Sequence, residues 1–347
     1  MFETIYGNSK AKSLLTRLVE RGRVPQSLLL TGPEGVGKKR FALEIARGFV
    51  CSDSSSALPC GNCPACLRAV EVELPTSAKK EDYEKVIPTA HPDIGLIVPN
   101  KNTIYVDAVR DLVREANFRP FEAEARVFII DEAEKLGLTQ RAAANALLKT
   151  LEEPAPATYL ILVTSKPSAL LQTIISRCQR VQFQPLSDTE ISELLLEKRE
   201  LSEDERRLVA RLSGGSASKA LGFDLEKFKL DRDRMLEVLK SAVKGTALSA
   251  SLRHSDEITS AKVDNAFESH LSVLSTLVRD TLLIGNELRD EIVNVDLLDE
   301  LEFVAHGCRT ETLSRWLVDI EDLFGSLRFN LNKKINSDAL FVRMARM

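Results

Sequence analysis

Hydrophobic and polar positions follow two different periods in the first half of the chain. Short apolar runs that are typical of buried strands occur at residues 28–31, 127–130 and 159–163. Apolar residues with helical spacing occur at residues 41–49, 106–116 and 139–151. The last of these helices should end before Pro154, because the residue that precedes a proline disfavours the helical conformation. Strands that alternate with helices predict an α/β domain built on a parallel, doubly wound sheet.

The pattern changes after residue 187. The last expected strand is 181–183, and residues 188–229 resemble a small helical unit that is interrupted by Gly214 and Gly215. Beyond residue 230 only helical spacing is found, with apolar stripes such as Val263, Phe267, Leu271, Leu274 and Val278. The sequence therefore predicts three domains: an α/β domain at 1–187, a small helical domain at 188–229 and an all-α domain at 230–347.

Composition narrows the range of partners. The chain has 347 residues, with 47 basic against 51 acidic side chains and a formal net charge of −4. A chain with this balance would meet DNA only through a local patch or through other proteins. No stretch approaches the roughly 20 apolar residues that a membrane span needs, and no apolar signal segment follows Met1. These features predict a cytoplasmic protein that has no membrane partner.

A glycine-rich turn lies between the first expected strand and its helix. Gly32, Gly35, Gly37 and Lys38 lie in a segment that fits G-x-x-x-x-G-K, the motif whose backbone N–H groups and lysine hold nucleotide phosphates. The next position normally carries Ser or Thr, whose hydroxyl binds Mg²⁺, but here it is Lys39. A lysine cannot bind a cation, because it has no acceptor. ATP or ADP could occupy this cradle, whereas a role for Mg²⁺ is not expected.

An acidic pair follows the second expected strand. Asp131 and Glu132 come directly after residues 127–130, where nucleotide hydrolases place an aspartate toward Mg²⁺ and a glutamate toward the attacking water. Without a hydroxyl at position 39, the metal site of Asp131 is incomplete. We hypothesise that the Lys39 ammonium lies near Asp131 and takes the place of the cation.

Four of the six cysteines cluster in a short segment after the phosphate loop. Cys51, Cys60, Cys63 and Cys66 have the spacing C-x8-C-x2-C-x2-C. Tetrahedral structural Zn²⁺ takes four sulfurs, and C-x2-C turns bring pairs of thiolates to the spacing that it needs. An iron–sulfur cluster uses the same ligand set, and four unliganded cysteines are the other alternative. The pattern favours zinc.

Five segments carry a resemblance to a known family. They are the cysteine module directly after the phosphate loop, residues 91–93 (H-P-D), residues 106–110 (V-D-A-V-R), residues 145–154 (N-A-L-L-K-T-L-E-E-P) and residues 176–178 (S-R-C). The chain resembles the clamp-loader subunits of bacterial DNA polymerase III over nearly its whole length. This resemblance implies an AAA+ fold whose small helical domain is a lid and whose last domain is an oligomerisation collar.

The resemblance also separates two kinds of subunit. Gamma/tau motor subunits carry Ser or Thr after the phosphate-loop lysine and an arginine in the lid, where this chain has Lys39 and Ser218. Arg177 of the S-R-C motif is retained. This combination resembles the delta-prime type, a stator that donates Arg177 as an arginine finger to the ATP of a neighbouring subunit. No independent ATPase or polymerase activity is then expected. An active gamma/tau-type motor and a P-loop ATPase unrelated to replication are the alternatives.

Further roles follow only from the resemblance. It implies a hetero-pentameric ring with gamma/tau and delta subunits, which acts on the sliding clamp and on primed DNA. Thr164 matches a position that senses the γ-phosphate, although a threonine that caps the next turn would give the same pattern. Arg141 and Lys149 lie about two helical turns apart and would face the DNA channel, with a solvated basic face as the alternative.

Overall fold

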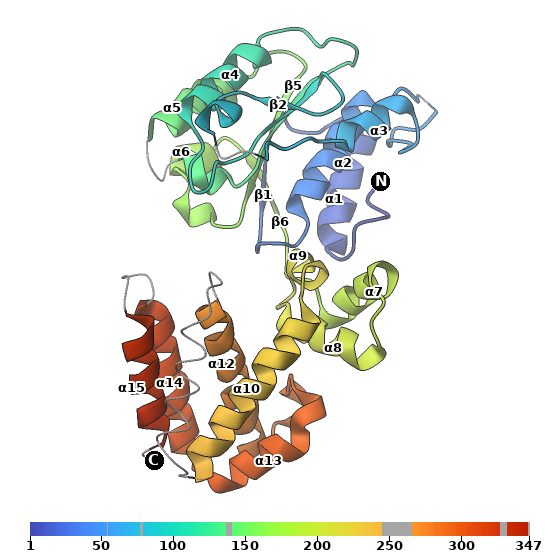
Figure 1. The fold of residues 1–347 in the computed structure, drawn as a ribbon. Helices are drawn as coiled ribbons and strands as arrows, with labels where there is room; N and C mark the ends of the chain where they lie inside the picture. Colours follow the sequence, from blue (N-terminus) through green and yellow to red (C-terminus); the bar gives the residue numbers. More distant parts are fainter. Residues whose placement is uncertain (54, 77–78, 137–140, 245–265, 327–331, 346–347) are drawn as a thin grey trace. The chain divides into compact units, whose positions relative to one another are not determined.

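The computed structural model describes residues 1–53, 55–76, 79–136, 141–244, 266–326 and 332–345. The chain divides into two compact units, Met1–Leu221 and Gly222–Met347 (Figure 1). Val263, residues 139–140 and the side chain of Arg141 lie outside the described part. The predicted domain boundaries at residues 187 and 229 stay predictions.

The first unit is built on a six-stranded sheet of order β2-β3-β4-β5-β1-β6. Its strands are β1 Ser27–Thr31, β2 Ile87–Pro88, β3 Ile94–Ile97, β4 Arg126–Ile130, β5 Thr158–Thr164 and β6 Gln179–Gln182. All neighbouring strands are parallel except β2, which pairs antiparallel with β3 at the edge. The predicted parallel α/β sheet is confirmed, and the two-residue β2 is its one antiparallel addition among the described residues.

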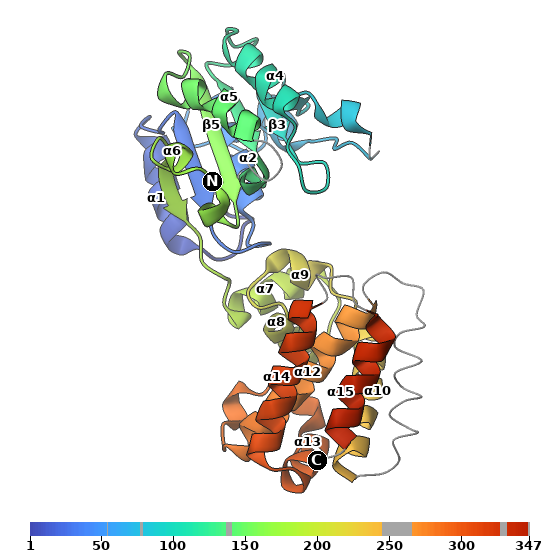
Figure 2. The same ribbon diagram turned by 90° about the vertical axis from the view of Figure 1, so that its left-hand side faces the viewer.

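Helices cover both faces of this sheet (Figure 2). The helices of this layer are α1 Ser9–Glu20, α2 Lys38–Val50, α3 Pro64–Val70, α4 Val106–Ala116, α5 Arg141–Glu152 and α6 Gln172–Ile175. One face packs against α4 and α5 through a fully buried cluster that includes Phe128 and Leu147. On α2, Phe41 and Ile45 are completely buried, and α1 and α3 pack against this helix. The sheet is therefore buried on both sides, as parallel sheets require.

Three short helices complete the first unit: α7 Asp188–Lys198, α8 Glu203–Leu212 and α9 Ala217–Leu221. The first two begin at capping boxes, in which Ser187 pairs with Glu190 and Ser202 with Glu205. In each box the serine oxygen accepts a backbone N–H, and the glutamate accepts the backbone N–H of the serine. These local signals explain why the chain becomes helical directly after the last strand.

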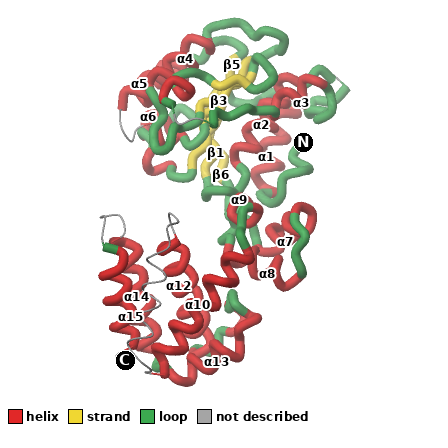
Figure 3. Tube along the Cα trace, in the orientation of Figure 1, coloured by secondary structure: helices red, strands yellow, loops and turns green. Residues whose placement is uncertain are grey.

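The second unit contains only helices and loops among its described residues (Figure 3). Its α-helices are α10 Leu225–Lys244, α12 Ala266–Gly285, α13 Leu298–Gly307, α14 Thr310–Ser326 and α15 Lys333–Ala345. Short 3₁₀ segments in the chain are Lys80–Tyr83, Ala133–Leu136, Pro167–Ala169, Arg289–Glu291 and Val295–Leu297. Trp316 is the largest side chain buried in the core of this unit. The helical C-terminal region is confirmed, and none of the described helices is long and apolar enough to span a membrane.

Candidate nucleotide and metal sites

The phosphate loop lies between the end of β1 and the start of α2. Gly35 has φ +77°, and a Cβ at this position would lie 2.0 Å from Ser216 Oγ. A Cβ on Gly32 would lie 2.6 Å from the carbonyl oxygen of Phe183. Only glycine fits at either position, because a side chain would collide with the segments that cover the loop. Ser218 N–H donates to Gly35 O at 3.1 Å. The position where a motor subunit would carry its lid arginine therefore contacts the phosphate loop, but the residue there is a serine.

Lys38 is buried at the first turn of α2. Its ammonium donates to the loop carbonyls of Gly32, at 2.7 Å, and Pro33, at 2.5 Å. Burial lowers the pKa of Lys38, and the negative charges of Glu134 and Asp131 act in the opposite direction. These two carboxylates therefore balance a lysine that the protein has removed from water.

Lys39 and Asp131 form an ion pair. Lys39 Nζ lies 3.3 Å from Asp131 Oδ2, and their side chains are 30% and 18% exposed. Asp131 follows the last residue of β4, and Lys39 lies in the first turn of α2. The juxtaposition that the sequence hypothesis required is present in the structure. Whether the ammonium replaces a cation stays a proposal.

Glu132, which was predicted from the sequence to face an attacking water, is paired with a lysine in the structure. Glu132 has φ +46° and pairs with Lys135 at 2.6 Å. The buried acid near Lys38 is instead Glu134, whose Oε1 accepts from the Ser165 hydroxyl at 2.6 Å. Sequence reasoning missed Glu134. The sequence pattern that could have predicted its burial is weak. Glu134 is one acid between Ala133 and Leu136, and these two residues are buried in the same 3₁₀ turn.

Thr164 ends β5 beside the phosphate loop. It is fully buried and in register with Thr31, the residue before Gly32. Its hydroxyl accepts the backbone N–H of Lys166 at 3.1 Å. This is the bond that a capping threonine would make, so a role in sensing the γ-phosphate stays a prediction.

Arg177 follows α6. Its guanidinium donates to Thr173 O at 2.9 Å and pairs with Glu152 at the end of α5, and the side chain is 32% exposed. Within the described part of the chain, both polar partners of Arg177 lie on α5 and α6, and neither belongs to the phosphate loop. Lys149 is exposed on α5, whereas the shared face that it was predicted to form with Arg141 lies outside the described side chains. The proposed roles of these basic residues stay predictions.

The four clustered cysteines converge. Their sulfurs all lie within 4.8 Å of one another, and Cys60 Sγ lies 4.0 Å from Cys66 Sγ. Tetrahedral zinc with bonds of about 2.3 Å would separate its sulfurs by about 3.8 Å. The sulfurs also accept backbone N–H groups: Cys51 from Cys60, Cys60 from Cys63, and Cys63 from Cys66, at 3.3–3.4 Å. The donor set and its orientation fit a structural Zn²⁺ ion.

The cysteine module is fastened to the sheet domain by two arginines. Arg47 of α2 donates to Cys66 O at 3.0 Å. Arg68 of α3 pairs with Glu122 at 2.7 Å, and Glu122 also lies 3.0 Å from His91 Nε2. A hydrogen bond from Ser52 is the main cause that lowers the pKa of Cys63 to about 5, whereas burial raises the pKa of Cys66. The lowered pKa favours the thiolate form of Cys63, whereas metal binding would have to deprotonate the thiol of Cys66.

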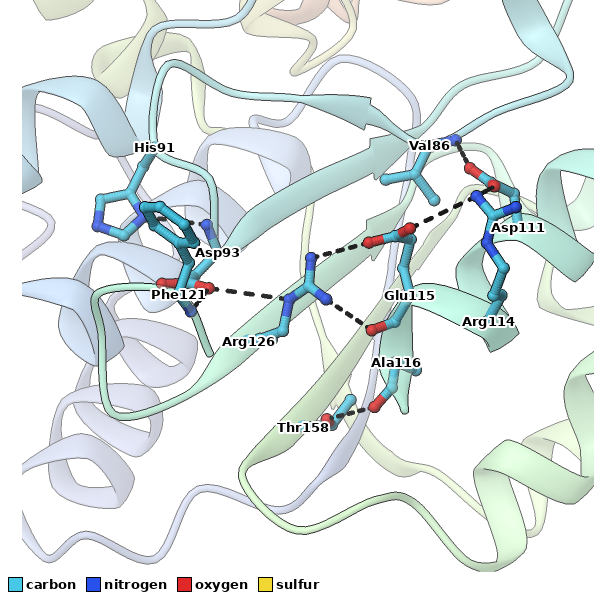
Figure 4. Close-up of polar contacts among 10 residues, drawn as sticks. All are labelled: Val86, His91, Asp93, Asp111, Arg114, Glu115, Ala116, Phe121, Arg126 and Thr158. Atoms are coloured by element: carbon cyan, nitrogen blue, oxygen red, sulfur yellow. Dashed lines mark hydrogen bonds and ion pairs between the residues drawn. The ribbon is translucent and has the colours of Figure 1, made fainter. Parts of the chain in front are cut away.

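The H-P-D segment organises the loop beside this module. Asp93 is completely buried and accepts the backbone N–H groups of Phe121 at 2.6 Å and of Glu122 and Ala123 at 2.9 Å each. Figure 4 shows Asp93 facing Arg126, whose Nε lies 3.8 Å away. This carboxylate fixes the chain that enters β4 and carries Glu122 toward Arg68.

Asp93→Asn is expected to lower the free energy of unfolding by about 2–4 kcal/mol, because an amide at this buried position would face at least one of the three N–H groups with another donor. Urea unfolding followed by circular dichroism measures the change. Asp107→Asn is the matched control, since Asp107 pairs with Arg110 on the exposed surface of α4. Such a pair contributes about 0–1 kcal/mol. Equal effects of the two substitutions would contradict the role given to Asp93.

Comparison with known proteins decides the family. The family described as "DNA polymerase III, delta subunit" matches residues 7–187, more than half of the chain. DNA polymerase III subunit delta' of Bacillus subtilis is 27% identical over 325 residues, which cover 93% of this chain and 92% of that protein. The delta' subunit of Pseudomonas aeruginosa is 31% identical over 249 residues, 70% of this chain and 69% of that protein. The chain belongs to the delta-prime family of DNA polymerase III subunits.

Membership of the delta-prime family confirms the resemblance that the sequence motifs indicated. DNA polymerase III subunit tau of Escherichia coli is 28% identical over 233 residues, which cover 63% of this chain but only 32% of tau. The chain thus spans about a third of the tau subunit. The similarity to the Bacillus delta' subunit continues into the helical unit, so the assignment rests on both units of the chain.

Proposed function

We propose that this delta-prime family chain is a stator subunit of a clamp loader, which helps to load the sliding clamp onto primed DNA during replication. The observation that carries the proposal is the ion pair between Lys39 and Asp131. It occupies the place where a motor subunit would hold magnesium, so the chain keeps the architecture of a nucleotide site without the means to hydrolyse ATP.

The remaining parts of the chain have roles that fit this function. Arg177 donates an arginine finger to the ATP of a neighbouring gamma/tau subunit, and Thr164 belongs to the nucleotide-sensing edge of the sheet. The four cysteines hold a structural Zn²⁺ ion. Residues 188–229 act as a lid, and residues 230–347 form a collar that assembles with gamma/tau and delta subunits into a hetero-pentameric cytoplasmic ring. Lys149 and Arg141 face primed DNA within that ring.

Reconstitution tests the proposal. The purified chain is combined with candidate gamma/tau and delta subunits, and ATP turnover is measured with and without primed DNA and clamp. We expect no turnover by the chain alone, and turnover stimulated by DNA and clamp only in the assembly that contains it. Magnesium-dependent turnover by the chain alone would instead support the alternative, an active gamma/tau-type motor, which the retained Lys38 and Asp131 would suit.

A further inference from the structure

Magnesium does not fit the phosphate loop of this chain. In P-loop proteins the residue after the conserved lysine binds Mg²⁺ through a hydroxyl. Lys39 offers three donors and no lone pair, so it cannot replace that ligand. Its ammonium instead lies 3.3 Å from Asp131 Oδ2, the carboxylate expected to face the ion. A divalent cation at this place would displace the ammonium and would be repelled by it.

The other nearby acids do not restore a metal site. Glu132 is held by Lys135 at 2.6 Å. Glu134 accepts from the Ser165 hydroxyl through Oε1, and its Oε2 has no hydrogen-bond partner among the described residues. Each of the three acids thus has its own hydrogen-bond or ion-pair partner among the described residues: Lys39 for Asp131, Lys135 for Glu132 and Ser165 for Glu134. Mg²⁺ in nucleotide sites takes one or two carboxylates besides waters and phosphates, and the carboxylate expected to face it here, Asp131, is already paired with Lys39.

Lys39 reduces the negative charge around the loop without a metal. Lys38 and Lys39 carry two positive charges, and the acids whose charges act on Lys38, namely Glu134, Asp131 and Glu34, carry three negative charges, so these five groups sum to −1. With Ser or Thr at position 39 the same groups would sum to −2, and more positive charge would be needed before a triphosphate could approach. Lys39 supplies part of that missing charge as a fixed side chain on the first turn of α2.

We infer that the Lys39 ammonium occupies the magnesium position, and that the phosphate loop binds nucleoside polyphosphates without a divalent cation. The inference deepens the proposed function, because it concerns the nucleotide cradle that the stator retains. Lys38 exchanges its bonds to Gly32 O and Pro33 O for phosphate oxygens. Lys39 stays on Asp131 and turns its remaining donors to the outer phosphates, and no bond is broken in the nucleotide.

ATP binding to the full chain tests the inference, with affinity measured by isothermal titration calorimetry in excess EDTA and in excess MgCl₂. The dissociation constants of the unmodified chain are expected to agree within about threefold in the two buffers. Lys39→Thr restores the hydroxyl and is expected to make binding at least about tenfold tighter in MgCl₂ than in EDTA. Lys39→Met removes the charge without adding a ligand, so it should weaken binding about tenfold or more in both buffers.

Lys135→Thr is the matched control, because it removes a lysine that pairs with an acid next to Asp131 but away from the loop. It should leave the affinity in both buffers unchanged. Tenfold tighter binding of the unmodified chain in MgCl₂, or no ATP binding in either buffer, would overturn the inference. Neither result bears on subunit identity, since that is measured as turnover of the reconstituted assembly.

Discussion

Arg177→Ala is expected to leave this chain folded and to lower ATP hydrolysis, at the neighbouring site that it serves, by about 10³- to 10⁵-fold. The guanidinium is partly exposed and, among the residues that the structure describes, bonds to Thr173 O and Glu152, which are both exposed, so its loss removes no buried contact. In the assembly it would leave Glu152 for the γ-phosphate, where charge develops in the transition state. Arg177→Lys should recover little activity, because an ammonium lacks the planar fork of donors.

Single-turnover hydrolysis by the reconstituted loader measures this effect, since total turnover also includes sites that Arg177 does not serve. Arg207→Ala is the matched control: Arg207 is another exposed arginine in an ion pair, with Glu203 on α8. Glu152→Gln removes the competing carboxylate and should preserve hydrolysis. Unchanged hydrolysis by the loader that carries Arg177→Ala would refute the arginine-finger assignment.

Three of the predicted strands have uninterrupted apolar residues. β1, β4 and β5 lie in the middle of the sheet and are almost entirely buried, so their central positions are apolar and polar residues occur only toward their ends. β3 was missed because Gly95 interrupts its four residues. The glycine is required, since a Cβ there would lie 2.3 Å from Val86 Cγ1. This requirement comes from a neighbouring segment, and no local pattern reveals it.

Three helices of the first unit, α1, α3 and α6, were not predicted. α1 has apolar residues at helical spacing, at positions 11, 14, 15, 18 and 19, so the sequence does carry its pattern. α6 has only four residues, too few to show a period. α3 has seven residues and begins at Pro64 within the cysteine cluster, where the metal-ligand spacing dominates the pattern. A helix of one or two turns, or one that begins within a metal-ligand motif, leaves a weak signal in the sequence.

The candidate sites divide in the same way. Motif spacing placed Lys39 near Asp131 and brought the four cysteines together, because both relations follow from adjacent elements of known geometry. The pairing of Arg177 with Glu152 and the burial of Glu134 could not be predicted. Both depend on how α5, α6 and the turn after β4 pack, and the sequence specifies packing only through many weak contacts at once.

Replacement of Cys66 by serine is expected to abolish zinc binding and to lower the melting temperature of the first unit by roughly 10 °C. Cys66 is the one fully buried ligand, and its carbonyl also receives Arg47. A structural zinc site contributes about 10–16 kcal/mol of binding free energy in zinc-finger peptides, and part of it stabilises the fold that presents the ligands. Loss of the ion should free α3 and weaken the contact between Arg68 and Glu122.

Metal content by inductively coupled plasma mass spectrometry and melting by differential scanning calorimetry measure the two effects. The unmodified chain should hold about one zinc per molecule, as a four-sulfur site predicts. Cys308→Ser is the matched control, because Cys308 lies in the second unit, outside the cluster, and its loss should leave zinc content unchanged. Iron with visible charge-transfer absorption would assign the site to an iron–sulfur cluster. If the unmodified chain holds no metal and has the same melting temperature as Cys66→Ser, then the module folds through Arg47, Arg68 and its N–H···S bonds alone.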